Sequence, residues 1–293
     1  MTWTRLRSLG LAAGLLLSAN AFAGQPVVIG STNFPEQLIL ANIYSDVLEA
    51  HGVDTEKRLN LGSREVVFPS LKSGELDMLP EYTGALLGYL TDGKSTEHRP
   101  DAVLAALRKQ LPNGLEMLKP ASAQDKDALV VRPKTAKRYD LETMSDLRGV
   151  ASKLVLGGPP ELKTRHIGLP GFKEVYGIQF RKFRSLDAGG PLTVGALKNG
   201  DIDVALMFTT QGIINARGWK ILKDDRNLIS AQNLVPVVRS DAMTPTIRKS
   251  LNAISARLTT EELQRMNRSV SVDKKSPKDV ARHWVDQNGL ANG

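Results

Sequence analysis

The chain has 293 residues, no cysteine and a formal net charge of +8. The absence of cysteine excludes disulfides, thiol chemistry and sulfur-ligated metal sites, so the stability of the fold depends on packing alone. The positive charge is moderate and dispersed, without a Lys/Arg-dense run that carries interleaved aromatic residues, and we therefore expect no nucleic-acid partner.

Residues 1–23 are predicted to be a secretory signal peptide. Arg5 and Arg7 form its positively charged start, and the apolar stretch Leu9–Leu17 is too short to span a bilayer. Residues 21–23 read Ala-Phe-Ala, which places small residues at the two key positions of a cleavage site. We expect cleavage before Gly24 and a periplasmic location, with no cysteine available for a lipid anchor.

Strands and helices are predicted to alternate after the leader. Val27–Gly30 is apolar and β-branched, as in a buried strand, and apolar residues from Leu38 to Leu48 recur at helical spacing before Gly52. A second strand is expected at 57–61 and a second helix at about 65–72. This alternation favours parallel α/β layers.

One segment of the chain is repeated. Residues 71–79 read Leu-Lys-Ser-Gly-Glu-Leu-Asp-Met-Leu, and residues 197–205 read Leu-Lys-Asn-Gly-Asp-Ile-Asp-Val-Ala. Each combines a helix end, a glycine suited to the left-handed position after it, and the start of a strand. General α/β sequence preferences alone also produce such a match. If the repeat reflects two similar lobes, Tyr82 and Phe208 follow equivalent strands and meet at one place.

A chain crossover between two lobes is predicted. The apolar segment Leu129–Arg132 is followed by the charged linker 133–140, and Leu234–Arg239 has the pattern of a strand that returns to the first lobe. We therefore expect an α/β, two-lobed fold of the type II periplasmic-binding-protein kind, with residues 24–131 and 236–293 in lobe 1 and residues 132–235 in lobe 2. Two connections between lobes make a hinge. Helices with N-terminal capping signals at Thr259 and Ser276 are expected to cover the first lobe.

Catalytic signatures are missing from the sequence. The four histidines have no metal-ligand spacing, and neither a phosphate-binding glycine loop nor a nucleophile motif occurs. We expect no cofactor and no metal. Carboxylates close to one another in sequence keep a periplasmic enzyme open as an alternative, with Asp77, Glu81 and Asp127 as its candidate groups.

Three segments resemble one known family. Residues 30–37 (Gly-Ser-Thr-Asn-Phe-Pro-Glu-Gln), 71–77 (Leu-Lys-Ser-Gly-Glu-Leu-Asp) and 80–84 (Pro-Glu-Tyr-Thr-Gly) are similar to motifs of the substrate-binding proteins of osmoprotectant ABC importers. The resemblance continues at Tyr176-Gly177, at 196–201 and at 236–239. It implies a protein that binds glycine betaine, choline or carnitine between its lobes and delivers it to a permease in the inner membrane.

The resemblance also implies a set of site residues and two departures from the family. A trimethylammonium group donates no hydrogen bond and is held by aromatic faces. At positions where the family has cage aromatics, this chain has Asp127 and the pair Gln232-Asn233, which suit a ligand with N–H donors, unless the loop alignment is shifted. The candidate ligand-binding residues are Asn33, Phe34, Gln37, Ser63, Tyr82, Thr83, Asp127, Phe208, Thr209, Gln211, Gln232 and Asn233.

The functional prediction is an extracytoplasmic solute-binding subunit of an ABC importer, monomeric, for a small cationic or zwitterionic osmolyte of the quaternary-amine type. Two further alternatives stay open beside the enzyme. In the first alternative, the same scaffold binds a different polar or cationic solute. In the second, the protein is a periplasmic sensory or adaptor subunit that presents a ligand without transporting it.

Overall fold

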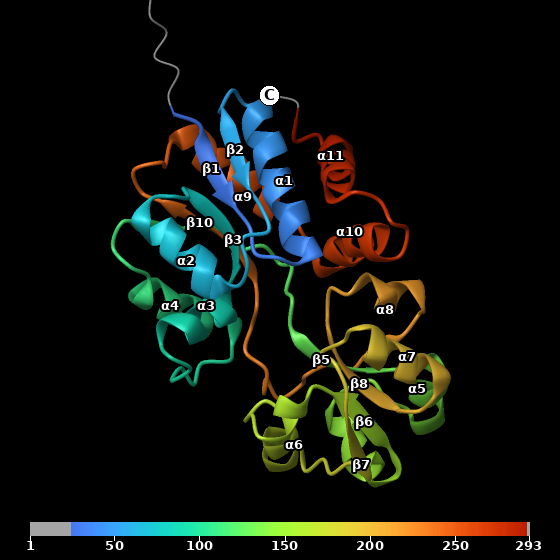
Figure 1. Cartoon of the computed structure of the whole chain (residues 1–293). Helices are drawn as coiled ribbons and strands as arrows, with labels where there is room; N and C mark the ends of the chain where they lie inside the picture. The colour runs from blue at the N-terminus through green and yellow to red at the C-terminus, as the bar shows by residue number, and fades with distance from the viewer. Residues whose placement is uncertain (1–24, 292–293) are drawn as a thin grey trace, which may run out of the picture.

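The computed structural model describes residues 25–291 (Figure 1). The predicted signal peptide, residues 1–23, lies outside this range. Within it, no helix combines the length and the apolar character that crossing a membrane requires. The described chain forms two five-stranded sheets, in the orders β2-β1-β3-β10-β4 and β7-β6-β8-β5-β9. Two separate sheets, each with its own helices, confirm the predicted two-lobed α/β class.

The first sheet is built from both ends of the chain. Strand β1 pairs in parallel with β2 and β3, whereas β10 runs antiparallel to both β3 and β4. The strands are β1 (Val27–Gly30), β2 (Thr55–Arg58), β3 (Met78–Tyr82), β4 (Leu115–Met117) and β10 (Leu234–Arg239). The helices of this lobe are α1 (Pro35–Ala50), α2 (Arg64–Ser73), α3 (Thr83–Leu90), α4 (Pro100–Gln110), α9 (Pro245–Ser255), α10 (Thr260–Ser271) and α11 (Pro277–Gln287).

The second sheet repeats this topology with the middle of the chain. Strand β6 pairs in parallel with β7 and β8, and β5 runs antiparallel to β8 and β9. The strands are β5 (Asp127–Val131), β6 (Val155–Gly158), β7 (Lys182–Ser185), β8 (Val204–Phe208) and β9 (Lys220–Ile221). The helices are α5 (Pro133–Tyr139), α6 (Leu169–Tyr176), α7 (Pro191–Asn199) and α8 (Gly212–Ala216), with short 3-10 turns at Ser145–Gly149, Ala151–Lys153 and Pro160–Lys163.

The sequence repeat marks equivalent places in the two lobes. Gly74 and Gly200 end α2 and α7, each with a φ of +87°, a left-handed conformation that favours glycine. After each glycine, an aspartate accepts a backbone N–H from the neighbouring parallel strand. Asp77 accepts the Val28 N–H of β1 at 2.8 Å, and Asp203 accepts the Val155 N–H of β6 at 2.9 Å. The two lobes therefore share local hydrogen bonding as well as strand order.

Three predicted boundaries differ from the structure. Strand β5 pairs with β8 and β9, so residues 127–131 belong to the second sheet and not to the first, where the sequence analysis placed them. The return to the first sheet begins at Leu234, two residues before the predicted boundary. The second strand covers Thr55–Arg58 instead of 57–61. The error at β5 has a physical origin, because an apolar run predicts a strand but does not say which sheet completes its hydrogen bonds.

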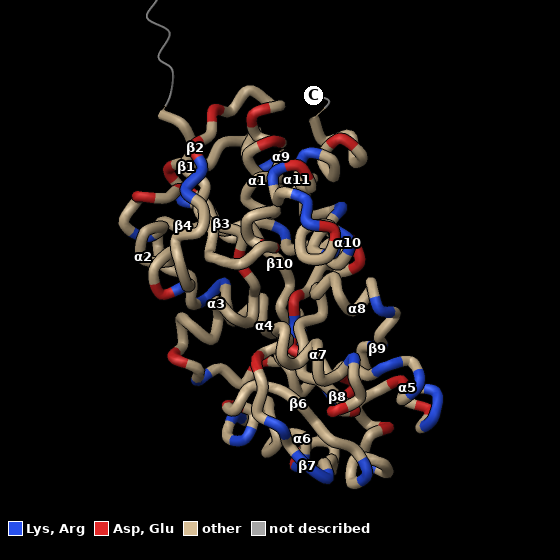
Figure 2. Tube along the Cα trace, turned by 45° about the vertical axis from the view of Figure 1, so that its right-hand side comes forward, with Lys and Arg blue, Asp and Glu red and all other residues tan. Residues whose placement is uncertain are grey.

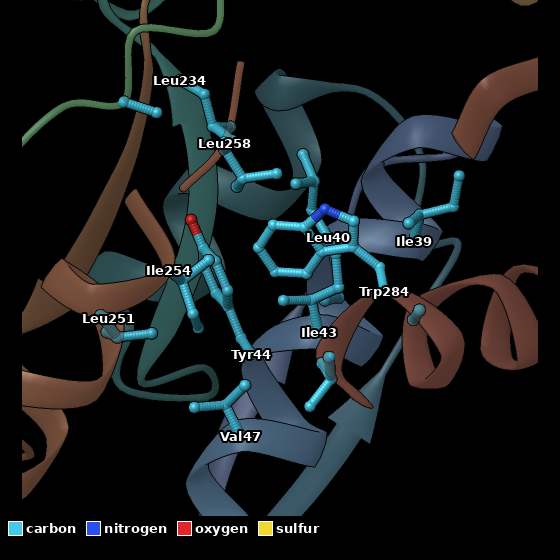
Figure 3. Packing of buried hydrophobic residues seen from close by; sticks show 14 of the residues in the cluster. Ile39, Leu40, Ile43, Tyr44, Val47, Leu234, Leu251, Ile254, Leu258 and Trp284 are labelled. Carbon is cyan, nitrogen blue, oxygen red and sulfur yellow. The ribbon is translucent and has the colours of Figure 1, made fainter. Parts of the chain in front are cut away.

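One of the two buried clusters of the first lobe lies between α1 and the C-terminal helices, and the other packs α2, α3 and α4. Figure 3 shows Leu40, Ile43 and Tyr44 of α1 packed with Trp284 of α11 and with Ile254 of α9. All five side chains are at most 2% exposed, and burying a side chain of this size stabilises the fold by about 1.5–3 kcal/mol. The capping predictions are confirmed, because the hydroxyls of Thr259 and Ser276 accept the N–H groups of residues 262 and 279.

Candidate ligand-binding cleft

A cavity of about 960 Å³ lies between the two lobes. The carboxyl-terminal end of β3, with Tyr82, reaches it from the first lobe, and the corresponding end of β8, with Phe208, reaches it from the second. The N-terminal ends of α1, α2, α3, α7 and α8, together with residues of α10, add to the wall. Ligands of open α/β sheets bind beyond the carboxyl ends of the strands, and both lobes present that end to one cavity.

Three aromatic rings line this cavity. The rings of Phe34 and Tyr82 are stacked, with centroids 6.2 Å apart and planes inclined at 26°. Phe208 comes from the opposite lobe. Tyr82 is only 5% exposed, and its hydroxyl donates a hydrogen bond of 2.6 Å to Glu36 Oε1. The repeat thus delivers Tyr82 and Phe208 to the same place, as predicted for two similar lobes.

A chain of hydrogen bonds connects the lobes beside the rings. Glu36 of α1 also accepts a hydrogen bond from the Asn267 side chain of α10. The same Asn267 amide donates to the carbonyl oxygen of Thr210 at 2.9 Å, and the Thr210 hydroxyl donates to Asp125 Oδ1 at 2.8 Å. The network joins α1 and α10 of the first lobe to the loop after β8 and to the segment that crosses between the sheets.

Burial shifts the carboxyl groups of the cleft toward their neutral forms. It raises the pKa of Glu36, although hydrogen bonds from Tyr82 and Asn267 oppose this effect. Burial and the neighbouring Glu36 charge raise the pKa of Asp125 to about 8. Burial also raises the pKa of Asp127, which the Arg165 charge partly offsets. A cation entering the cavity would favour the ionised forms, so the site is electrostatically suited to positive charge.

Arg64 and Glu81 form a pair on the same wall. The Arg64 guanidinium donates to both Glu81 carboxylate oxygens, with its two shortest bonds at 2.9 Å. The Glu81 charge raises the pKa of Arg64 against the opposing effect of burial. Glu81 is also held by the Tyr82 N–H, at 3.1 Å. This geometry makes Glu81 a partner of Arg64 and of the backbone.

Gln37 leaves a buried acceptor at the cavity. Its side-chain N–H₂ group donates to the carbonyl oxygen of Pro80 at 3.1 Å, while its Oε1 atom is buried and has no hydrogen-bond partner among the described residues. Gln37 is 1% exposed. The Thr32 hydroxyl, which also lines the cavity, is a second buried oxygen without a partner in the described chain. Buried polar atoms of this kind normally have a partner, and neither of these two has one among the described residues.

Most of the predicted site residues line the cavity, namely Asn33, Phe34, Gln37, Ser63, Tyr82, Asp127, Phe208, Gln211 and Gln232. Among them, Gln232 accepts the Ala85 N–H at 2.7 Å, and Gln211 donates to the carbonyl oxygen of Gly189 at 3.1 Å. These two amides therefore position the first turn of α3 and the loop before α7, as well as forming part of the cavity wall.

Thr83, Thr209 and Asn233 are not among the residues that form the wall, and their hydrogen bonds hold the crossing segments. The Thr83 hydroxyl accepts the Asn233 N–H at 3.1 Å. The Asn233 side chain donates to the carbonyl oxygen of Ala121 at 2.9 Å. The Thr209 hydroxyl donates to the carbonyl oxygen of Gln124 at 2.8 Å. The sequence predicted these three polar side chains to bind the ligand. In the structure, their hydrogen bonds instead hold the two segments that cross between the lobes.

Four residues of the network are not among the predicted ligand-binding residues: Glu36, Asp125, Thr210 and Asn267. Glu36 lies inside the motif at residues 30–37, Thr210 lies between the predicted residues Thr209 and Gln211, and Asp125 lies two residues before Asp127. Their positions in or beside predicted segments were the available signal. No sequence signal pointed to Asn267, because the C-terminal helices were expected only to cover the first lobe. Its bond to Glu36 joins residues 231 positions apart.

Two lobes of the same topology, joined by crossing segments around a cavity with aromatic and carboxyl groups on its wall, define a two-lobed solute-binding protein. Residues 25–287 match the family model of the substrate binding domain of the ABC-type glycine betaine transport system, and the chain belongs to this family. Such domains work on the extracytoplasmic side of the membrane, where they bind small osmolytes and deliver them to an ABC permease.

Individual relatives agree with this assignment. The chain is 31% identical to the glycine-betaine-binding protein of Pseudomonas aeruginosa over 302 residues, 97% of this chain and 95% of the relative. It is 30% identical to the glycine betaine-binding protein YehZ of Escherichia coli over 280 residues, 91% and 92% of the two chains. A crystal structure described as a glycine betaine/carnitine/choline ABC transporter superposes with a TM-score of 0.85 at 26% identity, covering 91% of this chain and 100% of the other.

The enzyme alternative is wrong, because the family consists of transporter substrate-binding proteins and not of enzymes. The structure gives its candidate carboxylates other partners. Asp77 accepts the Val28 N–H beneath the sheet, and Glu81 is paired with Arg64. Asp127 alone of the three lines the cavity without a side-chain hydrogen bond in the described chain, and it is available to a solute.

Proposed function

We propose that the protein captures a small cationic or zwitterionic osmolyte of the quaternary-amine type in the cavity between its lobes and delivers it to a permease in the inner membrane. The observation that carries the ligand class is the meeting of Phe34, Tyr82 and Phe208 with carboxyl groups from both lobes in one cavity. The relatives that bind glycine betaine support the same class.

The physical basis is the affinity of aromatic faces and carboxylates for a cation. An ammonium group over an aromatic face gains about 0.5–2 kcal/mol, and the gain rises when water is excluded. Phe208 lies on the second lobe and the Phe34–Tyr82 pair on the first, so rotation of the lobes about the crossing segments changes how closely the rings surround a ligand. Closure by such a hinge is the common way in which two-lobed proteins retain a solute.

Binding is tested by titration calorimetry with glycine betaine, choline and carnitine. Tyr82→Ala is expected to weaken binding of the preferred ligand by ~1–2 kcal/mol, because it removes one ring of the stacked pair. Tyr139→Ala is the matched control, since Tyr139 lies on α5 outside the cavity wall. The proposed ligand class fails if none of the three compounds binds the folded protein.

Transport is tested separately in cells. Deletion of the gene should abolish uptake of the bound solute, and the gene encoding a Tyr82→Ala protein should restore it poorly. Uptake that is unchanged by deletion, together with retained binding in vitro, would favour the sensory or adaptor alternative over an importer subunit.

We also propose that the leader is cleaved before Gly24 and that the mature protein is periplasmic. The support is the charged start, the short apolar stretch and the Ala-Phe-Ala sequence at 21–23. Amino-terminal sequencing of the protein released by osmotic shock should begin at Gly24. Recovery of the full-length chain from the membrane fraction would contradict the proposal.

A further inference from the structure

The net charge of the described chain is carried by the second lobe. Residues 127–228 contain seventeen lysines and arginines against eleven aspartates and glutamates, an excess of six. The two segments of the first lobe, 25–126 and 229–291, contain twenty of each kind and are neutral. Charge that is dispersed along the sequence is therefore gathered in space. Figure 2 shows lysines and arginines concentrated at the far end of the second lobe, around α5, α6 and β7.

Five exposed cations of this lobe lie on segments that contact one another, and we call them the basic end. They are Arg148, Lys153, Lys173, Arg181 and Lys182. The Arg181 N–H, just before β7, donates to the carbonyl oxygens on either side of Lys153, at 3.1 and 3.0 Å. Arg148 lies against Gly177 at the end of α6, where a Cβ atom would be 3.3 Å from the Arg148 Nε atom. The N–H of Gly177 in turn donates to the carbonyl oxygen of Lys173. The two 3-10 turns, α6 and β7 thus bring the five cations to one end of the lobe.

The basic end is not neutralised by the described chain. None of its five side chains forms an ion pair with a described residue, and the Arg and Lys ion pairs of the second lobe lie elsewhere, at Arg132–Asp203 and Lys220–Glu142. Two acids on the same helices are engaged by other groups. Asp146 accepts the Thr143 N–H at 2.7 Å, and Glu174 lies 3.9 Å from His166 Nδ1. Protein surfaces normally intersperse charges of both signs, so a surface of one sign attracts a partner of the opposite sign.

We propose that the basic end adsorbs to a bilayer surface that carries anionic phospholipids. None of its five residues lines the ligand cavity or either of the two smaller cavities, so the surface has no pocket there for a compact anion. Long cationic side chains without fixed partners suit a field of mobile phosphate headgroups. A permease partner also places the working protein beside a bilayer.

The adsorption is peripheral and electrostatic. The large apolar side chains that the described chain leaves exposed, Leu61, Val66, Leu192 and Val272, lie on other segments, so the basic end has none to insert between lipids. Each lysine or arginine contributes through attraction to the surface potential, which salt screens. Adsorption through the second lobe would raise the concentration of the protein in the layer of solvent next to the permease, independently of the solute in the cavity.

Co-sedimentation of the purified protein with vesicles provides the test. One set of vesicles is an equimolar mixture of phosphatidylglycerol and phosphatidylcholine, and the other is phosphatidylcholine alone. At low salt we expect the partition coefficient for the anionic vesicles to exceed that for the neutral ones by about ten-fold or more. Raising NaCl from about 50 to about 300 mM shortens the screening length from about 14 to about 6 Å and should reduce binding to the anionic vesicles by about ten-fold.

Two matched double variants assign the adsorption to the basic end. Arg181→Gln with Lys182→Gln removes two of its cations and should weaken binding to the anionic vesicles by about ten-fold. Arg108→Gln with Lys109→Gln is the control, because it removes an adjacent, exposed Arg-Lys pair from α4 of the first lobe and changes the net charge equally. Its partition coefficient should stay within about two-fold of the wild-type value. Circular dichroism and thermal melting verify that both variants are folded, and the wild-type comparison of vesicles and salt stands even where a variant does not fold.

Three results would overturn the proposal. The first is no binding to the anionic vesicles at low salt, or equal binding to both kinds of vesicle. The second is an equal loss of binding in the two double variants, because total charge and not the basic end would then govern adsorption. The third comes from replacing chloride by inorganic phosphate at the same ionic strength. Equal release by the two salts supports a headgroup surface, whereas release by phosphate alone would show a site for the free ion. All of these measurements leave the proposed solute binding untouched, because the basic end lies outside the cavity wall.

Discussion

Replacing Asp125 with asparagine is expected to remove a pH-dependent loss of stability from the ligand-free protein. Asp125 accepts a hydrogen bond from the Thr210 hydroxyl at 2.8 Å, and burial together with the Glu36 charge raises its pKa to about 8. Asparagine resembles the neutral carboxyl, because its side-chain oxygen still accepts that hydrogen bond and carries no charge. The variant therefore isolates the effect of ionising one group in the cleft.

The sign follows from proton linkage. Between the ordinary aspartate pKa of 3.8 and the folded-state pKa of about 8, the native protein holds a proton that the unfolded chain has released. The stability contribution is therefore fully present below the unfolded pKa and is lost as pH rises through the folded pKa. One proton corresponds to about 1.4 kcal/mol per pH unit. Because Asp125 lines an open cavity and its residue is partly exposed, we expect about half of the full effect, about 2 kcal/mol between pH 5 and pH 8.

Thermal or urea unfolding at several pH values without ligand provides the assay. Wild type and Asp125→Asn should have similar stability near pH 5, and the variant should gain about 4–8 °C in Tm relative to wild type by pH 8. Asp54→Asn is the control, because Asp54 is exposed and lies outside the cavity wall. Stability curves of Asp125→Asn and wild type that stay parallel across this pH range would refute the reasoning.

The remaining predictions concern binding and packing. A net-cationic ligand should bind more tightly as pH rises from 6 to 8 and should release protons, because its charge favours ionised Glu36, Asp125 and Asp127 against their raised pKa values. Calorimetry in two buffers of different ionisation enthalpy measures the number of protons released. Binding without proton release would contradict this linkage. Gly212→Val should lower the free energy of unfolding by at least about 2 kcal/mol, because a Cβ atom there would lie 2.1 Å from the Arg268 backbone nitrogen. Gly195→Ala is the control, because its Cβ atom would lie in open space, and it should be neutral or slightly stabilising in urea unfolding. Equal urea midpoints for the two variants would contradict the packing argument. Tyr44→Ala should destabilise by about 3–5 kcal/mol, since Tyr44 is 1% exposed in the first-lobe core; a loss below about 1 kcal/mol would show that the site collapses without a cavity.

Local sequence determined the elements and part of the cavity. The strand at Val27–Gly30 and the helix starts at Thr259 and Ser276 follow from neighbouring residues, and the structure places them as predicted. The repeated segment correctly brought Tyr82 and Phe208 to one place, because each residue ends an equivalent strand. These features depend on residues a few positions apart, and such interactions can be read from the order of the chain.

Tertiary structure alone decided the sheet to which β5 belongs and the partners of the polar groups in the cleft. Strand β5 has the same apolar pattern whichever lobe it joins, and only its pairing with β8 and β9 places it in the second sheet. Glu36 and Asn267 meet because α10 packs against α1, while Thr83, Thr209 and Asn233 are used by the crossing segments. Polar side chains bond to whichever groups packing brings near, so their roles depend on contacts between distant segments that local patterns do not encode.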